Sequence, residues 1–189
     1  MLEKLLSLLL ALLLLTAPAL AESPIFSRLY IEKLLSAVCT ALDAEELTYE
    51  KDEEYDGCFF AVDLTTPSAL GDEIYYDVYA YDDGVSIIAY FENEVPAGSR
   101  DELIRLCNHF SSSIYLGKFY VDAYYDTLTY ELFIPMDPRD VRSFDLELIG
   151  EYVWMAASML DYYQEYFLLV IDGSETAANV FAMWEADNQ

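Results

Sequence analysis

Apolar residues recur along the chain with two different spacings, and the order of these spacings predicts the order of the structural elements. Spacings of three and four residues predict helices over residues 26–42, 99–112 and 144–170. Alternation and short apolar runs predict strands over residues 58–64, 73–81, 85–92, 118–123 and 128–134. The predicted order is α-β-β-β-α-β-β-α. This segregation is typical of an α+β fold, with an antiparallel sheet of about five strands and helices packed on one face.

Turn residues mark the borders of several predicted strands. Asp83-Gly84 separates the second and third strands with a sequence typical of a tight hairpin. Thr65-Thr66-Pro67 ends the first strand and Pro135 ends the last, because proline cannot donate a hydrogen bond to a strand ladder. An acidic stretch, residues 43–56, precedes the first strand.

Capping residues mark the ends of the later helices. Ser99 and Glu102 have the spacing of a capping box at the start of the second helix. Gly173 caps the end of the long helix, and Ser174 begins a short terminal helix. The apolar stripe of the long helix is formed by Ile149, Val153, Ala156, Leu160, Tyr163 and Phe167. The terminal helix carries Ala177, Phe181 and Trp184.

The first 21 residues form a different pattern, which predicts the localisation of the protein. Lys4 precedes an almost unbroken apolar run from Leu5 to Leu15, Pro18 breaks that run, and Ala19-Leu20-Ala21 has the small-x-small pattern of a cleavage site. The run is too short for a membrane span, which needs about 20 apolar residues. We therefore expect a signal peptide over residues 1–21 and an exported mature chain without a membrane span. The mature chain is predicted to contain one domain, residues 22–172, and a C-terminal helical tail, residues 173–189.

The charge of the chain narrows the range of partners. The formal net charge is −26, from 35 acidic and 9 basic residues. Nucleic acid and anionic membranes are repelled by such a charge, whereas a basic protein, a basic peptide or a cation is attracted. The same charge could serve only to keep an aromatic-rich exported protein in solution. Disorder is not expected, because the chain contains 17 tyrosines and 10 phenylalanines.

The number of cysteines is odd, so they cannot all be paired within one chain. Outside the cytoplasm, Cys39, Cys58 and Cys107 allow one disulfide and leave one thiol over. Cys107 lies on the apolar stripe of the second helix, which favours a buried and inert thiol. The spacings match no zinc motif, and the sequence does not decide the pairing.

Several short stretches carry a family likeness. They are Leu103, Leu106, Cys107, Asn108 and Phe110, then Gly117-Lys118-Phe119-Tyr120-Val121-Asp122, the strand over 128–134, Asp161-Tyr162-Tyr163 and Leu168-Leu169-Val170-Ile171-Asp172-Gly173. In these residues and in its element order the chain resembles the YbjN domain family, whose fold is similar to type III secretion chaperones. The resemblance covers most of the mature chain. It implies a non-enzymatic adaptor or chaperone-like role and dimerisation, and it carries over no catalytic residue.

This sequence also departs from the usual family pattern. It has a predicted signal peptide, an extreme acidic charge and many tyrosines. These departures argue against a cytoplasmic regulator and against a chaperone of secreted effectors.

Strand alternation gives the sharpest functional prediction. Successive side chains of a strand point to opposite faces, so the aliphatic residues gather on one face, where they meet the helices. The other face then carries tyrosines and acids, which we expect to bind a partner or a second copy of the chain. The candidate residues are Tyr75, Asp77, Tyr79, Tyr81, Tyr90, Tyr120, Asp122 and Tyr124. Two alternatives remain open: cross-strand tyrosine pairs that only stabilise the sheet, or a terminal helix that covers this face.

The segment from Asp52 to Gly57 approaches the spacing of a calcium-binding EF-hand loop. Acidic residues occupy positions one, three and five, Gly57 is at position six and Asp63 is at position twelve. However, position three is Glu, position twelve is Asp instead of the bidentate Glu, and a strand follows where an EF-hand has a helix. We therefore expect an acidic surface turn and predict no metal site and no cofactor.

No catalytic motif stands out. His109 is the only histidine, and in a helix it points about 200° away from Cys107, so the two form no local dyad. With 35 carboxylates, some two of them could always form an acid pair of the glycosidase type, so the presence of carboxylates is no specific evidence for a glycosidase. The chain is therefore expected not to be an enzyme, and a hydrolase using surface carboxylates is the last alternative.

The sequence as a whole predicts an exported binding or chaperone-like adaptor protein of YbjN type. Its partner is expected to be a basic or amphipathic protein or peptide, bound by the tyrosine and acid surface or by a helix groove, and a homodimer is plausible. An exported immunity or inhibitor protein that blocks a basic toxin is the competing interpretation. Charge-driven binding of either kind should weaken as ionic strength rises.

Overall fold

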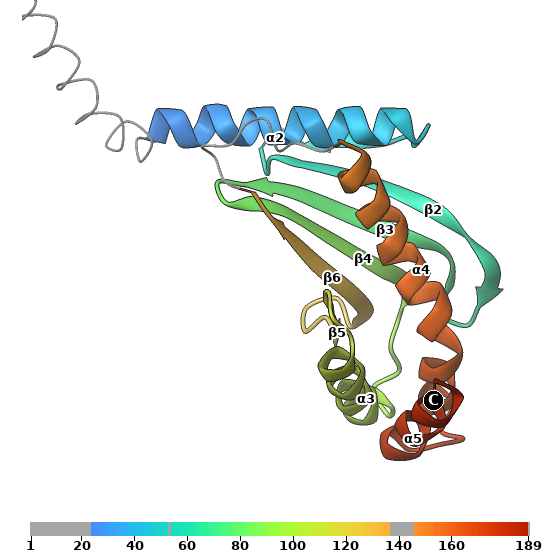
Figure 1. The fold of residues 1–189 in the computed structure, drawn as a ribbon. Coiled ribbons are helices and arrows are strands. Elements are labelled where there is room, and N and C mark those ends of the chain that lie inside the picture. The colour runs from blue at the N-terminus through green and yellow to red at the C-terminus, as the bar shows by residue number, and fades with distance from the viewer. Residues whose placement is uncertain (1–23, 53, 137–145, 189) are drawn as a thin grey trace, which may run out of the picture.

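The computed structural model describes residues 24–52, 54–136 and 146–188, without the side chains of residues 24–26, 65–67 and 146. Ten elements follow one another in this part of the chain (Figure 1). They are α2 Pro24–Ala44, β1 Glu50–Asp52, β2 Gly57–Ser68, β3 Gly71–Tyr81, β4 Gly84–Glu94, α3 Arg100–Ser113, β5 Lys118–Val121, β6 Thr127–Pro135, α4 Leu146–Ile171 and α5 Ala177–Asp187. The predicted signal peptide lies outside the described residues.

The strands form one six-stranded antiparallel sheet in the order β1-β2-β3-β4-β6-β5. Neighbours in sequence pair from β1 to β4, and Gly84 in the hairpin between β3 and β4 faces Tyr81. The chain then leaves the sheet through α3 and returns as β5 at the edge. Because β6 inserts between β4 and β5, the short strand β5 is the outermost strand.

Helices cover one face of this sheet, as the alternation of apolar residues predicts. Figure 1 shows α4 running across the strands and α2 lying across one end of the sheet. The side chains that face these helices are fully buried, among them Val78, Val85 and Ile87. The buried hydroxyl of Tyr76 donates a hydrogen bond to the Val153 carbonyl at 2.9 Å, which ties β3 to α4. The α+β class and the antiparallel sheet are thus confirmed, and the sheet has six strands where about five were predicted.

The predicted stripe of the long helix is also confirmed. All six of its residues are buried: Ile149, Val153, Ala156, Leu160, Tyr163 and Phe167. Gly173 follows the helix with φ +76°, a conformation that glycine adopts without strain, and its amide donates to the Val170 carbonyl. None of the helices in the described residues is long and apolar enough to cross a membrane.

An aromatic cluster joins the helices at the far end of the sheet. Phe110 of α3 is completely buried at its centre. The surrounding rings come from β5, α4 and α5: Phe119, Tyr163, Tyr166, Phe167, Phe181 and Trp184. Helix α5 therefore packs against α3 and α4, and the possibility that it covers the tyrosine-bearing face of the sheet is wrong.

The strands differ from the prediction by one additional strand, β1, and by shifted ends, most clearly in β2 and β5. The strand β1 was not predicted, because it is short and polar and lies within the acidic stretch. Strand β2 runs beyond Thr65-Thr66-Pro67 to Ser68, because β1 pairs only with Gly57 to Phe59 and leaves the rest of β2 at a sheet edge, where proline is tolerated. Strand β5 ends at Val121, before the predicted end at Ala123.

The predicted capping box is wrong in its details. Ser99 precedes α3, but its hydroxyl donates to the Pro96 carbonyl instead of accepting from the helix. Glu102 accepts a hydrogen bond from the backbone N–H of Ala177 at 3.0 Å. The terminal helix starts at Ala177, with Thr176 as its N-cap, instead of at Ser174. Glu102 thus caps the N-terminus of α5, 75 residues away in the sequence, and a local sequence pattern cannot predict such a contact.

Candidate functional site

The face of the sheet opposite the helices carries the predicted tyrosines and acids. On β3, Ile74, Tyr76, Val78 and Ala80 are buried, while Tyr75, Asp77 and Tyr79 are half-buried and Tyr81 is exposed. Tyr75 pairs across the strands with Tyr90 of β4, and their rings stack with centroids 6.0 Å apart. We call this surface the tyrosine–acid face. It is formed by Tyr75, Asp77, Tyr79, Tyr81, Ile88, Tyr90, Tyr120 and Asp122.

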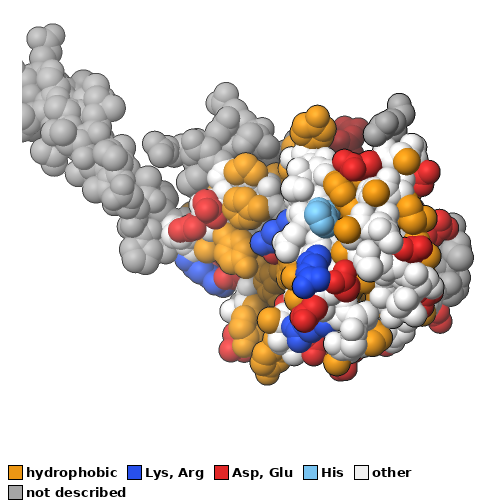
Figure 2. Space-filling view, turned by 90° about the horizontal axis from the view of Figure 1, so that it is seen from below, with side chains coloured by type: hydrophobic (Ala, Val, Ile, Leu, Met, Phe, Trp, Pro, Cys, Tyr) orange, Lys and Arg blue, Asp and Glu red, His pale blue; other side chains and the backbone are white. Residues whose placement is uncertain are grey.

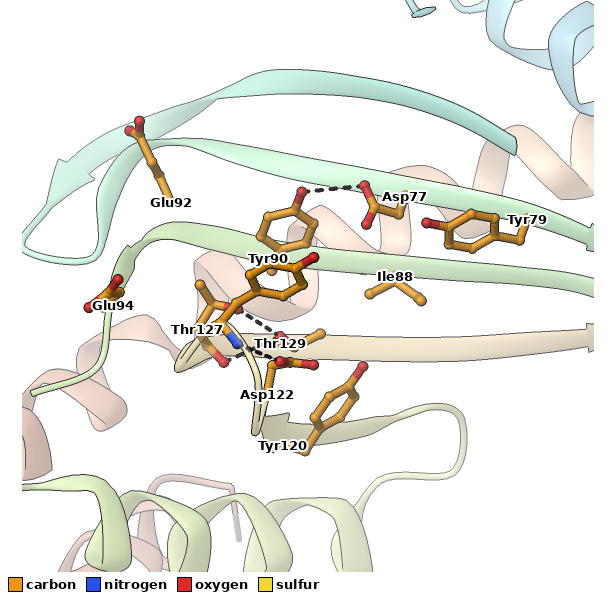
Figure 3. A pocket seen from close by; sticks show the side chains of 11 residues that line it. Asp77, Tyr79, Ile88, Tyr90, Glu92, Glu94, Tyr120, Asp122, Thr127 and Thr129 are labelled. Atoms are coloured by element: carbon orange, nitrogen blue, oxygen red, sulfur yellow. Dashed lines mark hydrogen bonds between the residues drawn. The ribbon is translucent and has the colours of Figure 1, made fainter. Parts of the chain in front are cut away.

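A pocket of about 550 Å³ opens at the centre of the tyrosine–acid face (Figure 3). Strands β3, β4, β6 and β5 all contribute to it, and α4 lies behind the sheet in this view. The pocket is lined by Asp77, Tyr79, Ile88, Tyr90, Glu92, Glu94, Tyr120, Asp122, Tyr125, Thr127 and Thr129. Five of the eight predicted site residues therefore line one cavity: Asp77, Tyr79, Tyr90, Tyr120 and Asp122.

The other three predicted residues lie outside this pocket. Tyr75 lines a smaller neighbouring hollow beside β1 and β2, and its hydroxyl donates to Glu73 Oε2 at 2.8 Å. Tyr81 is exposed at the end of β3, with its ring 6.4 Å from that of Tyr79. Tyr124 was predicted to point from a strand, but it lies in the turn after β5 and is 86% exposed.

Asp122 determines the geometry of that turn. Its Oδ1 atom accepts hydrogen bonds from the backbone N–H groups of Tyr124 at 2.7 Å and Tyr125 at 2.8 Å. Such bonds from an aspartate to the next residues fix a tight turn. As a result Tyr125, which the sequence analysis missed, lines the pocket in place of Tyr124.

Asp77 is a half-buried acid at one side of the pocket. Its carboxylate accepts a hydrogen bond from the Tyr90 hydroxyl at 3.3 Å (Figure 3). Burial raises the pKa of Asp77 above its usual value, and the hydrogen bond from Tyr90 opposes this shift only in part. Burial and the neighbouring carboxylate likewise raise the pKa of Tyr79 to about 12, so this phenol stays neutral.

Among the described residues, no basic side chain lines the pocket, although four carboxylates do. Within the described residues, none of Asp77, Glu92, Glu94 and Asp122 forms an ion pair. Lys118 lies nearby, with its Nζ 5.4 Å from the centroid of the Tyr120 ring, and it pairs with Glu131 at 3.1 Å. The pocket therefore combines uncompensated negative charge with aromatic rings.

The acidic turn does not have the geometry of a calcium loop. Residues 54–56 connect β1 to β2, and Asp52 Oδ1 accepts the backbone N–H groups of Glu54 and Tyr55. Asp56 pairs with Arg28 at 2.7 Å. Asp63 lies on β2 six residues beyond Gly57, which is roughly 20 Å along an extended strand. In the described part of the chain, no cluster of three or more His, Cys, Asp or Glu side chains could hold a metal ion.

His109 does not form a catalytic dyad with a described cysteine. Its exposed ring stacks on Phe181 of α5, with centroids 4.8 Å apart. Figure 2, seen from below, shows the histidine at the surface beside apolar side chains. Cys107 is buried in α3, as predicted, and burial raises the pKa of its thiol to about 12.

The fold and this face define an α+β domain that carries a pocket of tyrosines and acids on the sheet face opposite α4. The family model for YbjN, described as "Putative bacterial sensory transduction regulator", matches residues 34–169. The chain therefore belongs to the YbjN family. No curated protein and no solved structure matches the chain. The likeness to type III secretion chaperones and the division of the mature chain into a domain and a tail stay predictions.

Proposed function

We propose that this protein is an exported, non-catalytic regulatory adaptor of the YbjN family, which binds a basic segment of a protein partner through its tyrosine–acid face. The observation that carries the proposal is the pocket itself. It places four tyrosine rings beside four carboxylates that form no ion pair within the described residues. The family match, to a model described as a regulator, supports a role in regulation.

The chemistry of the pocket favours a lysine or arginine side chain as its occupant. A cation over a tyrosine ring is attracted by the ring's negative face, and a desolvated contact of this kind contributes about 2 kcal/mol. The half-buried Asp77 and Asp122 can accept charge-assisted hydrogen bonds from the same cation. Lys118 already lies over Tyr120 of this chain in such an arrangement.

The surroundings of the pocket favour a protein over a free small cation. The tyrosine–acid face continues beyond the pocket to Tyr75 and Tyr81, which offer further amphipathic contact area. The net charge of −26 would also attract a basic partner over a long range and raise the rate of encounter. A second copy of this chain is a poor occupant, because it carries the same charge.

The test is affinity capture with protein made from the full-length sequence. The bait is exposed to envelope and secreted fractions of the producing cells, washed at low and at high salt, and the bound proteins are identified by mass spectrometry. A basic partner released by salt is expected. We then measure the affinity of that partner for the double variant Asp77→Asn with Asp122→Asn, which keeps the hydrogen-bonding shape and removes two charges.

The matched control is the double variant Glu165→Gln with Glu185→Gln. Both residues are exposed on α4 and α5, away from the sheet face, and their substitution changes the net charge by the same amount. Loss of charge-assisted bonds of about 1.5–3 kcal/mol each predicts a loss of affinity of at least tenfold for the pocket variant alone. Equal affinities of the two variants, or a partner that binds with Tyr79→Ser and Tyr90→Ser in place, would refute the proposal.

A further inference from the structure

Two of the three cysteines meet across the helix–sheet boundary. Cys39 lies on α2 and Cys58 near the start of β2, and their sulfur atoms are 3.3 Å apart. A disulfide bond has a length of about 2.05 Å, so a closure of about 1.3 Å would join them. Cys107 belongs to α3, at the aromatic end of the molecule, and is only 1% exposed.

We propose that Cys39 and Cys58 form a disulfide bond that fastens α2 to β2, and that Cys107 stays reduced. The sequence allows three pairings, and the geometry selects this one. The proposal does not depend on the tyrosine–acid face, because neither sulfur lies on it.

The two thiols differ in a way that determines how the bond forms. Cys58 is completely buried, whereas Cys39 is partly exposed and can be reached by an oxidant. The Cys39 thiolate attacks a low-molecular-weight disulfide such as oxidised glutathione, forms a mixed disulfide and releases one glutathione thiolate. The sulfur of Cys58, after losing its proton, displaces the second glutathione and closes the Cys39–Cys58 bond. Two protein thiols are thereby oxidised and one glutathione disulfide is reduced to two thiols.

The position of the bond gives it a structural role. Helix α2 contacts the sheet mainly through β3 and meets α4 at its C-terminal end, where the Trp154 indole N–H donates to Glu45 Oε2 at 2.8 Å. A bond from Cys39 to Cys58 would add a covalent link between α2 and β2. It would also close a loop that contains β1 and the acidic turn, and so restrain the β1–β2 hairpin.

The sequence suits a direct test of the pairing by peptide mapping. Trypsin cleaves after Lys33, Lys51, Arg100, Arg105 and Lys118, and therefore releases the three cysteines in separate peptides. Protein made from the full-length sequence is incubated with oxidised and reduced glutathione, free thiols are blocked with N-ethylmaleimide, and the digest is analysed without reduction. We expect residues 34–51 linked to residues 52–100, and the Cys107 peptide alkylated after unfolding.

Variants provide the second measurement. Oxidation should raise the melting temperature of the parent and of the control variant Cys107→Ala, and should leave that of Cys39→Ser unchanged. The proposal fails if the folded protein retains three alkylatable thiols at oxidising glutathione ratios, or if Cys107 appears in the linked peptide. It also fails if the melting temperature of Cys39→Ser rises on oxidation as much as that of the parent.

Discussion

Substitution of Phe110 by alanine is the most direct test of how the helical layer holds the sheet. Phe110 is 0% exposed, and the nearest ring centroids, those of Tyr163 and Phe167, are 4.6 and 5.4 Å away. Removal of a buried phenylalanine side chain costs about 3–5 kcal/mol, from lost transfer energy and from the cavity left behind. Because three different elements supply the surrounding rings, the site cannot collapse easily, and we expect the upper part of this range.

This loss has a consequence that is readily measured. For a protein of this size, each kcal/mol shifts the melting temperature by about 2–4 °C, so Phe110→Ala should melt roughly 10–15 °C below the parent. Thermal unfolding followed by circular dichroism measures the difference. Ile104→Ala on the same helix is the matched control, because this side chain is 37% exposed and its loss should cost less than about 0.5 kcal/mol.

The same cluster also supports the pocket. Ser111, next to Phe110, accepts a hydrogen bond from the Phe119 N–H at 2.8 Å, which holds the edge strand β5 against α3. Strand β5 carries Tyr120 into the pocket. If Phe110→Ala melted within about 3 °C of the parent, the inference that this cluster anchors α3, α5 and β5 would be refuted.

Three further substitutions test single features. Burial raises the pKa of Asp77, so the fold is more stable when this carboxyl group is protonated, and that stability is lost as the pH rises through the raised pKa. Asp77→Asn should therefore melt above the parent at neutral pH, with a smaller difference near pH 4. Thermal unfolding at a series of pH values measures this difference. Gly117→Ala would place a Cβ against the Tyr130 hydroxyl at φ +73° and should cost at least about 2 kcal/mol in chemical unfolding, whereas Gly98→Ala, with open space around it, should be nearly neutral. Glu102→Ala removes the acceptor for the first N–H of α5 and should cost about 1 kcal/mol and speed amide hydrogen exchange in α5.

Much of the fold could be predicted from the sequence because the two spacings of apolar residues are clear. On β3, alternation alone predicts that Val78 is buried and that Tyr79 faces the other side, even when the neighbouring strands are unknown. The same alternation could have found Glu92, which follows Tyr90 by two residues and lines the pocket. Strand β1 carries no such signal, since it contains only Glu50, Lys51 and Asp52.

The pocket could not be predicted, because it depends on the order of strands in the sheet. Asp77 on β3 and Asp122 after β5 line one cavity that spans the neighbouring strands β3, β4, β6 and β5, in that order. Alternation within a strand says which side chains share a face, but it does not say which strands are neighbours. Tyr125 lines the pocket where Tyr124 was predicted, because Asp122 closes a turn directly after β5. Such a turn can be recognised only when the end of the strand is known.

The environment of Asp77 links the stability of the sheet to its proposed function. Asp77 is a half-buried carboxylate that forms no ion pair within the described residues, which weakens the fold at neutral pH. The hydrogen bond from Tyr90 offsets only part of this cost. An asparagine or a threonine would fit the same strand position at a lower cost. If the proposed binding occurs, a lysine or arginine of the partner would reduce this cost, and part of the binding free energy would come from that relief. For this reason the substitutions that stabilise the tyrosine–acid face should be the ones that weaken binding.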